Sequence, residues 1–204
     1  MKLKLANAKA IKYACLNFHY AKSVPSVQYG FNVYNDDDEW CGVVCFGGVA
    51  TPNIGKPFDL LQGEILELVR VALNGKQKTT SEVVAASLRE LHRIDPILKM
   101  VVSYADLDQE HAGTIYQATN WIYLGKMNSG SRGAFIINGK KTHPRTIGSM
   151  GGVQSLKWVK ENLDPNAIEF ITKGKHRYIY CFDKKLRKKW LKEHQPYPKK
   201  SVVE

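Results

Sequence analysis

The sequence lacks long apolar runs, and it has few cysteines and no internal repeat. No stretch of its 204 residues reaches the roughly 18 uninterrupted apolar residues that a membrane helix needs, which argues against a membrane-spanning protein. Residues 1–5 lack the apolar run of a secretion signal, so we expect a cytoplasmic protein. The cysteines fit neither a zinc spacing nor a dense disulfide framework, and we expect them to be reduced and mostly buried. They are Cys15, Cys41, Cys45 and Cys181.

The composition is that of an ordinary globular chain, with 44% hydrophobic and 24% charged residues. Its net charge of +11 is unevenly distributed along the chain. Residues 1–138 hold 14 Lys/Arg against 13 Asp/Glu, whereas residues 139–200 hold 16 against 5. The sequence therefore predicts a nearly neutral core, 1–138, and a basic region, 139–204, that completes the same domain and contacts nucleic acid.

The end of the basic region predicts a cationic helix. Leu186, Trp190 and Leu191 recur at helical spacing, so they can pack inward while the lysines between them stay in water. A solvated helix face is the ordinary explanation of such a segment. Because the whole charge excess lies in one region, a polyanionic partner is favoured, since clustered cations displace counterions from phosphates. Nucleic acid is the leading partner class.

The order of the predicted elements indicates an α/β (α+β) protein with a mixed sheet and crossover helices. Thr80 and Ser81 are expected to cap the second helix, and Asn138–Gly139 is a hairpin turn signal. The expected strands cover 2–6, 28–34, 39–49, 63–73, 98–104, 121–126, 134–138 and 175–182. The expected helices cover 8–20, 82–94, 113–119, 152–163 and a basic segment after 182.

Residues 103–125, SYADLDQEHAGTIYQATNWIYLG, resemble the signature of Mom-type DNA-modification proteins of Mu-like phages. Shorter segments agree in order, so that the resemblance covers roughly residues 12–199: FHYAKSVPS, VCFGGVATPNIGKPF, ELVRVAL, KHRYIY and PYPK. That family resembles the GCN5-related N-acetyltransferase fold, which implies a single mixed sheet flanked by helices, with a basic insertion and a C-terminal helix. The resemblance implies a transferase that places a carbamoylmethyl group on N6 of adenine in phage DNA and so protects it from host restriction.

The resemblance places the donor at the strand end ELVRVAL and the segment NGKQKTTSEV that follows it. In acetyltransferase-like domains a helix N-terminus faces the donor phosphate there. Segment 70–75 lacks the first glycine of the usual Gln/Arg-x-x-Gly-x-Gly/Ala loop, so acetyl-CoA and glycyl-tRNA both stay open as acyl donor. A capped helix with exposed lysines is the alternative. The donor-binding candidates are Arg70, Gly75, Lys76, Lys78, Ser81 and Asn120.

The catalytic candidates lie in the central string and near the N-terminus. Tyr116 falls where many such acetyltransferases place the tyrosine that protonates the leaving group. Asp106, just past a strand end, could accept a proton from the adenine amine or orient His111. An ordinary buried tyrosine and a turn-capping aspartate are the alternatives. His19 and Tyr20 match family segments and are expected, with the loop at Asn53, to form the pocket for a flipped base.

Phosphate contacts are expected from basic residues of the C-terminal third. These are His143, Arg145, Lys175, Arg177 and Lys188, for which solvated loops and strand ends are the alternative. No histidine spacing supports a metal site, and we expect none. DNA is the expected substrate and tRNA a second nucleic-acid partner.

The chemistry sets further requirements. The exocyclic amine of adenine is a poor nucleophile and is stacked in a duplex, so it needs an activated donor and either base extrusion or a single strand. A glycyl group on N6 is an isomer of the carbamoylmethyl product, which predicts an aminoacyl donor followed by rearrangement. Two other classes stay open: an ordinary N-acyltransferase acting on a protein or small molecule, and a non-enzymatic DNA-binding protein.

Overall fold

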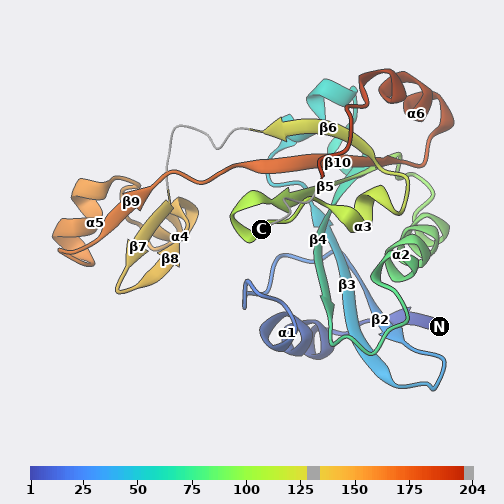
Figure 1. The fold of residues 1–204 in the computed structure, drawn as a ribbon, viewed down its shortest axis with the longest axis horizontal. Coiled ribbons are helices and arrows are strands. Elements are labelled where there is room, and N and C mark those ends of the chain that lie inside the picture. The colour runs from blue at the N-terminus through green and yellow to red at the C-terminus, as the bar shows by residue number, and fades with distance from the viewer. Residues whose placement is uncertain (128–133, 200–204) are drawn as a thin grey trace. The chain divides into compact units, whose positions relative to one another are not determined.

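A computed structural model describes residues 1–127 and 134–199, which belong to two compact units (Figure 1). The core unit comprises Met1–Tyr104, Gly113–Gly125 and Arg177–Lys199. The second unit, here called the inserted unit, comprises Ala105–Ala112 and the described part of Lys126–His176. The larger of the two described sheets has seven strands and the smaller has three.

The core unit is built on the seven-stranded sheet, in which the strand order is β1-β2-β3-β4-β5-β10-β6. The strands from β1 to β4 pair antiparallel, whereas β4 and β5 run parallel. Since β10 lies between β5 and β6, the chain returns to the middle of this half of the sheet after the inserted unit. The strands are Lys2–Leu5 (β1), Tyr29–Tyr34 (β2), Trp40–Gly48 (β3), Ile65–Leu73 (β4), Met100–Asp106 (β5), Ile122–Met127 (β6) and Lys175–Cys181 (β10).

Polar side chains start the helices of the core unit. The side chain of the preceding residue accepts a backbone N–H in the first turn of α1, α2 and α6, the residues being Asn7, Thr79 and Asp183. The prediction that Thr80 and Ser81 cap helix α2 is therefore wrong. Thr79 is the cap, and the two predicted residues already lie inside α2. The helices are Ala8–Asn17 (α1), Thr80–Ile94 (α2), Thr114–Gln117 (α3) and Lys184–Trp190 (α6).

The parallel strands β4 and β5 pair near their beginnings and then separate. Their register runs from Ile65 opposite Met100 to Glu67 opposite Val102. At the next position a side chain links the two strands instead of the backbone: Ser103 Oγ lies 3.0 Å from the carbonyl oxygen of Leu68. A register shift between β3 and β4 marks a bulge at the same place, which bends β4. The fork between the carboxyl ends of two parallel strands is a usual ligand position in open α/β sheets.

One face of the core sheet carries both α1 and α6. Helix α1 packs on Cys45, and α6 packs through Leu186 and Trp190 on a cluster that contains Ile65. The register pairs Cys45 with Arg70 and Gly47 with Glu67. Side chains two apart in a strand share a face, so Cys45, Glu67 and Ile65 all lie on the same face of the sheet. Both helices therefore cover the sheet face that carries Glu67 and Arg70.

The inserted unit has its own small sheet, ordered β8-β7-β9. Its first two strands form the predicted hairpin, and the turn residues Asn138 and Gly139 have φ values of 48° and 74°, as a two-residue turn of this kind requires. Its core consists of Phe135, Ile147, Val159 and Ala167. The elements are Ala134–Ile137 (β7), Lys140–Thr142 (β8), Pro144–Ser149 (α4), Leu156–Asn162 (α5) and Ile168–Phe170 (β9).

Most predicted elements are confirmed, and the differences concern short elements. Helix α5 begins after Ser155, whose hydroxyl caps it, and not at Gly152 as predicted. The six-residue α4 and the three-residue β9 were not predicted, because so few residues carry no readable periodicity. All four cysteines are buried and unbridged, as expected. Within the described residues no helix is both long enough and apolar enough to cross a bilayer.

Candidate active site

Tyr116 lies on the short helix α3 of the core unit and points its hydroxyl at the fork between β4 and β5. Its side chain is only 8% exposed, and its Oη lies 2.8 Å from Ser103 Oγ. Since Ser103 Oγ is also within hydrogen-bond distance of the Leu68 carbonyl, one serine hydroxyl links both strands to the tyrosine. A serine has a single proton, so it donates to one of these two oxygens at a time.

The surroundings keep the Tyr116 phenol protonated. The pKa of Tyr116 is raised to about 12, mainly by burial. The hydrogen bond from Ser103 acts to lower this pKa, and smaller contributions from Tyr20, Glu67 and Tyr178 act to raise it. At neutral pH the phenol is therefore a proton donor and not a base. Tyr20 and Tyr116, two predicted catalytic residues, are thus electrostatic neighbours, although 96 positions separate them in the sequence.

Glu67 and Ser103 are functional candidates that the sequence did not single out. Burial is the main cause of the raised pKa of both Tyr104 and Tyr116, and the charge of Glu67 adds to it, so this carboxylate lies within electrostatic range of both phenols. Both residues stand in segments that carried the family resemblance, since Glu67 opens ELVRVAL and Ser103 opens SYAD. The resemblance was therefore the available signal, but nothing in the sequence says that these two side chains meet Tyr116.

His19 and Tyr20 follow α1 in the core unit. Their rings are in contact, with centroids 4.3 Å apart and planes tilted by 31°, and His19 Nδ1 accepts the backbone N–H of Ala21 at 3.1 Å. Tyr20 is 52% exposed, so one side of this aromatic pair is accessible to a ligand. Their predicted role as a base pocket stays a prediction.

The C-terminal segment holds α3 in position. Tyr197 Oη donates to the carbonyl of Trp121 at 2.6 Å, and Gln117 Nε2 donates to the carbonyl of Pro198 at 3.2 Å. The PYPK segment of the sequence therefore has a structural place: it packs around the helix that carries Tyr116. Gly113, with φ 75°, starts that helix and leaves no room for a Cβ beside the Tyr178 ring.

Asp106 belongs to the inserted unit, where it ends β5. Its carboxylate accepts the backbone N–H of Asp108 at 3.0 Å, and so caps the short turn Leu107–Gln109. The backbone N–H of His111 donates to the carbonyl of the same aspartate at 3.1 Å. The turn-capping alternative is what the described contacts show, and a catalytic role for Asp106 stays a prediction.

The predicted donor loop lies against an acidic turn of the β2–β3 hairpin. Lys76 Nζ pairs with Glu39 at 2.9 Å, which raises the pKa of Lys76. Asn35 Nδ2 donates to the carbonyl of Lys76 at 3.4 Å. Lys78 contributes, after the chain's amino group, to the lowered pKa of Asp36. Carboxylates therefore already match the positive charge of this loop.

The other donor candidates do not converge on one point. Arg70 donates to Ser23 Oγ at 3.1 Å on the α1 face, while Ser81 Oγ lies 3.4 Å from Thr79 Oγ1. Gly75, with φ 89°, has open space where a Cβ would stand. The Asn120 carbonyl accepts from Arg187 at 3.2 Å. Open space and a helix start at 75–81 are compatible with a donor, but the cations there are paired.

The predicted nucleic-acid contacts fall in both units. His143, Arg145 and Lys175 belong to the inserted unit, around α4 and at the start of β10. Arg177 and Lys188 belong to the core unit, where the Arg177 guanidinium lies 5.9 Å from the Phe58 ring centroid. Their contact with nucleic acid stays a prediction. Among residues 1–127 and 134–199 there is no group of three acidic, histidine or cysteine side chains able to hold a metal ion.

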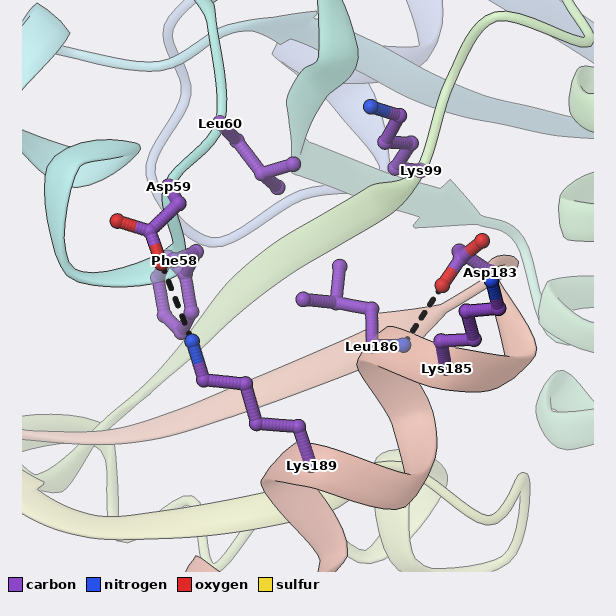
Figure 2. A pocket seen from close by; sticks show the side chains of 8 residues that line it. All are labelled: Phe58, Asp59, Leu60, Lys99, Asp183, Lys185, Leu186 and Lys189. Atoms are coloured by element: carbon purple, nitrogen blue, oxygen red, sulfur yellow. Dashed lines mark hydrogen bonds and ion pairs between the residues drawn. The ribbon is translucent and has the colours of Figure 1, made fainter.

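A cavity of about 320 Å³ opens beside α6 in the core unit (Figure 2). Its lining combines apolar side chains with three lysines and two aspartates. Lys189 pairs with Asp59 at 3.1 Å, and Asp183 accepts the backbone N–H of Leu186 at 2.6 Å. The lining residues are Phe58, Asp59, Leu60, Lys99, Asp183, Lys185, Leu186 and Lys189.

Comparisons with known proteins agree with this architecture. The model of the Mom protein family matches residues 1–199. The chain is 26% identical over 191 residues to methylcarbamoylase mom of Escherichia phage Mu, covering 89% of this chain and 76% of that protein. Mutant forms of the spermidine/spermine N-acetyltransferase SpeG from Vibrio cholerae match with a TM-score of 0.51 and 11% identity, over 92% of this chain and 98% of theirs.

A dodecameric structure of spermidine N-acetyltransferase from Vibrio cholerae also matches, with a TM-score of 0.51 and 10% identity over 92% of this chain and 96% of that one. At such identities these likenesses concern the fold alone. They confirm the predicted mixed sheet of the GCN5-related N-acetyltransferase type.

Proposed function

Because the chain belongs to the Mom protein family, we propose that it is a transferase that modifies the N6 amine of adenine in phage DNA. The product carries a carbamoylmethyl-type group, and the modification protects the DNA from host restriction. The Mu relative, named a methylcarbamoylase, supports this assignment of the transferred group. The observation that carries the proposal is the family match over residues 1–199, which includes Tyr116 and its contacts at the fork of the sheet.

The chain's own residues have the chemistry for an acyl transfer. The N6 lone pair forms a bond to the carbonyl carbon of the donor, and the bond from that carbon to the donor's oxygen or sulfur breaks. The amine loses a proton to a base, and the leaving atom gains one. Tyr116 supplies the second proton, because its pKa of about 12 keeps it protonated at neutral pH. When Ser103 donates to Tyr116 Oη, it stabilises the phenolate that results.

Two carboxylates are candidates for the base that takes the first proton. Asp106, the predicted base, is engaged as a turn cap in the inserted unit. Glu67 lies in the core unit, where its charge acts on Tyr104 and Tyr116. His19 and Tyr20 provide an exposed aromatic surface for the extruded adenine.

The donor delivers a two-carbon unit with a nitrogen atom, or the nitrogen is added later. A glycyl group, N6–C(=O)–CH2–NH2, is an isomer of the carbamoylmethyl group, N6–CH2–C(=O)–NH2. A glycyl ester such as glycyl-tRNA therefore balances the atoms after rearrangement, whereas acetyl-CoA alone yields an acetyl group and needs a nitrogen source. The paired lysines of the loop at 74–79 also give little free charge for the pyrophosphate of coenzyme A.

Mass spectrometry of nucleosides tests the reaction class. Plasmid DNA from cells that express the chain is expected to contain an adenine heavier by one glycine residue. An adenine heavier by an acetyl group would indicate an ordinary N-acyl transfer. Unmodified DNA together with salt-sensitive DNA binding would contradict the proposal and favour a non-enzymatic DNA-binding protein.

Reconstitution tests the donor. Purified protein and DNA are combined with charged glycyl-tRNA, with uncharged tRNA, or with acetyl-CoA. Modification that requires the charged tRNA supports the glycyl donor. Modification with acetyl-CoA and no aminoacyl donor contradicts it, and tight coenzyme A binding without any dependence on DNA would favour another acceptor.

A further inference from the structure

Helix α6 presents two different sides to the solvent. Leu186 and Trp190, one turn apart, pack on the core cluster and fix the rotation of the helix. With 3.6 residues per turn, Lys185 and Lys189 then stand on one flank, and both line the cavity of Figure 2. Lys184 and Lys188 stand away from it, exposed and outside its lining. We call the cavity with its lysine flank the α6 groove.

The α6 groove has a rigid frame. The Trp190 and Phe58 rings meet edge to face with centroids 4.7 Å apart, and Phe58 is 1% exposed. The guanidinium of Arg177 lies over the same Phe58 ring, 5.9 Å from its centroid. Asp183 caps the helix, so the start of α6 is also held in place. The lysines of the groove therefore extend from a fixed base, which lowers the entropy that a ligand must overcome.

The charge of the groove is not matched by its carboxylates. Asp183 is used as a helix cap, Asp59 pairs with Lys189, and Lys99 pairs with Glu64 at 2.5 Å. Lys185 has no carboxylate partner among the described residues. The same helix and the turn after it add further cations, so the groove lies in a field of positive charge. These are Lys184, Arg187, Lys188 and Lys192.

We propose that the α6 groove holds the phosphodiester backbone of the substrate DNA. Positions 185 and 189 lie one turn apart on one side of α6, about 6 Å along its axis, a length that spans about two nucleotides of one DNA strand. Lysines on such a track bind phosphates by releasing counterions and need no base sequence. That the nucleic acid is DNA rests on the proposed function.

The groove lies on the sheet face that also carries Glu67 and Tyr104. Arg177, beside Phe58, lowers the pKa of Tyr104, which burial and Glu67 raise. Glu67 in turn acts on Tyr116. Helix α1, which leads to His19 and Tyr20, covers the same face. A strand seated along α6 therefore shares a sheet face with α1 and Glu67.

Two double variants with equal loss of charge test the proposal. K185Q/K189Q removes two lysines of the groove, and K9Q/K12Q removes two exposed lysines of helix α1. Binding of a short DNA duplex is measured between 50 and 200 mM salt. Each lost phosphate contact lowers the salt slope by about 0.9, so K185Q/K189Q should lose about 1.8. Wild-type affinity should accordingly fall about 12-fold more than that of K185Q/K189Q over this range.

The single variant Asp59→Asn is expected to change DNA affinity in the opposite direction. It releases Lys189 from its ion pair, so DNA binding should tighten and the slope should steepen. The ion pair is largely exposed, and unchanged thermal unfolding is expected to show that all three variants fold. Equal losses in the two double variants would overturn the proposal, as would a K185Q/K189Q slope equal to wild type. Loss of tRNA binding with intact DNA binding would overturn the assignment to DNA.

Failure of the proposed function is separately visible. If the wild-type protein leaves adenine unmodified, while K185Q/K189Q alone lowers the salt dependence of DNA binding, the groove binds DNA and the enzymatic proposal fails. If adenine is modified and K185Q/K189Q binds DNA like wild type, only the groove proposal fails.

Discussion

Ser103 Oγ and Tyr116 Oη lie 2.8 Å apart at the point where β4 and β5 stop pairing. The serine also stands 3.0 Å from the Leu68 carbonyl, so it replaces the missing backbone contact between the strands. One hydroxyl therefore both closes the start of the fork and fixes the phenol that we propose as the proton donor. The pair links the architecture of the sheet to its chemistry.

Tyr116→Phe should abolish adenine modification and preserve DNA affinity. General acid catalysis contributes about 10²–10⁴-fold, and the substitution removes the proton without changing the ring. Nucleoside mass spectrometry measures the modification, and a salt titration of duplex binding measures the affinity. Tyr13→Phe, which removes an exposed phenol of the core unit, is the matched control. Equal modification by wild type and Tyr116→Phe would remove Tyr116 from the mechanism.

Ser103→Ala should slow modification and leave DNA affinity unchanged. When Ser103 donates to Tyr116 Oη it stabilises the phenolate that forms as the phenol gives up its proton, and alanine removes that bond. Nucleoside mass spectrometry over time measures the rate, and thermal unfolding checks that the variant folds. Ser103→Thr retains the hydroxyl and is expected to restore the wild-type rate. An alanine variant that modifies adenine at the wild-type rate would contradict the assignment.

Stability should fall as the pH rises above about 9. Burial raises the pKa of Cys45 from 9.0 to about 12, and that of Tyr116 from 10.0 to about 12. Between these values the unfolded chain holds fewer protons than the folded one, so the free energy of unfolding declines with pH. Each such group contributes at most about 1.4 kcal/mol per pH unit.

Denaturant unfolding under reducing conditions from pH 8 to 11 measures this slope. Cys45→Ala removes one raised group, so its stability should decline less steeply with pH than that of wild type. Cys41→Ala, which removes a second buried thiol of the same strand, is the matched comparison. Parallel curves for wild type and Cys45→Ala would show that the thiol does not account for the slope.

Gly113→Ala should destabilise the core unit and impair modification together. A Cβ at this residue would lie 2.5 Å from the Tyr178 ring, and the φ of 75° is strained for alanine. A cost of about 1–3 kcal/mol is expected from overpacking and backbone strain. Gly63→Ala has open space and serves as the neutral control. Thermal unfolding of both variants is the measurement, and similar midpoints would refute the role given to Gly113.

Local patterns identified most elements of the fold because their causes are local. The Asn138–Gly139 turn and the spacing of Leu186 and Trp190 each depend on neighbours a few residues away. Short elements such as β9 escaped prediction for the same reason, since three residues have no period. The family resemblance likewise pointed to Tyr116 and to the acetyltransferase-like sheet without any knowledge of contacts.

The sequence by itself determined the sheet type, the segregation of charge into the last third, and the tyrosine at position 116. Only the tertiary structure decided which side chains meet. Ser103, Leu68 and Tyr116 come from three elements, Lys76 finds its carboxylate 37 positions earlier, and Lys185 rather than Lys188 lines the groove. The periodicity of one element says which face is apolar. The element that packs against that face depends on the strand order and on where the parallel strands separate.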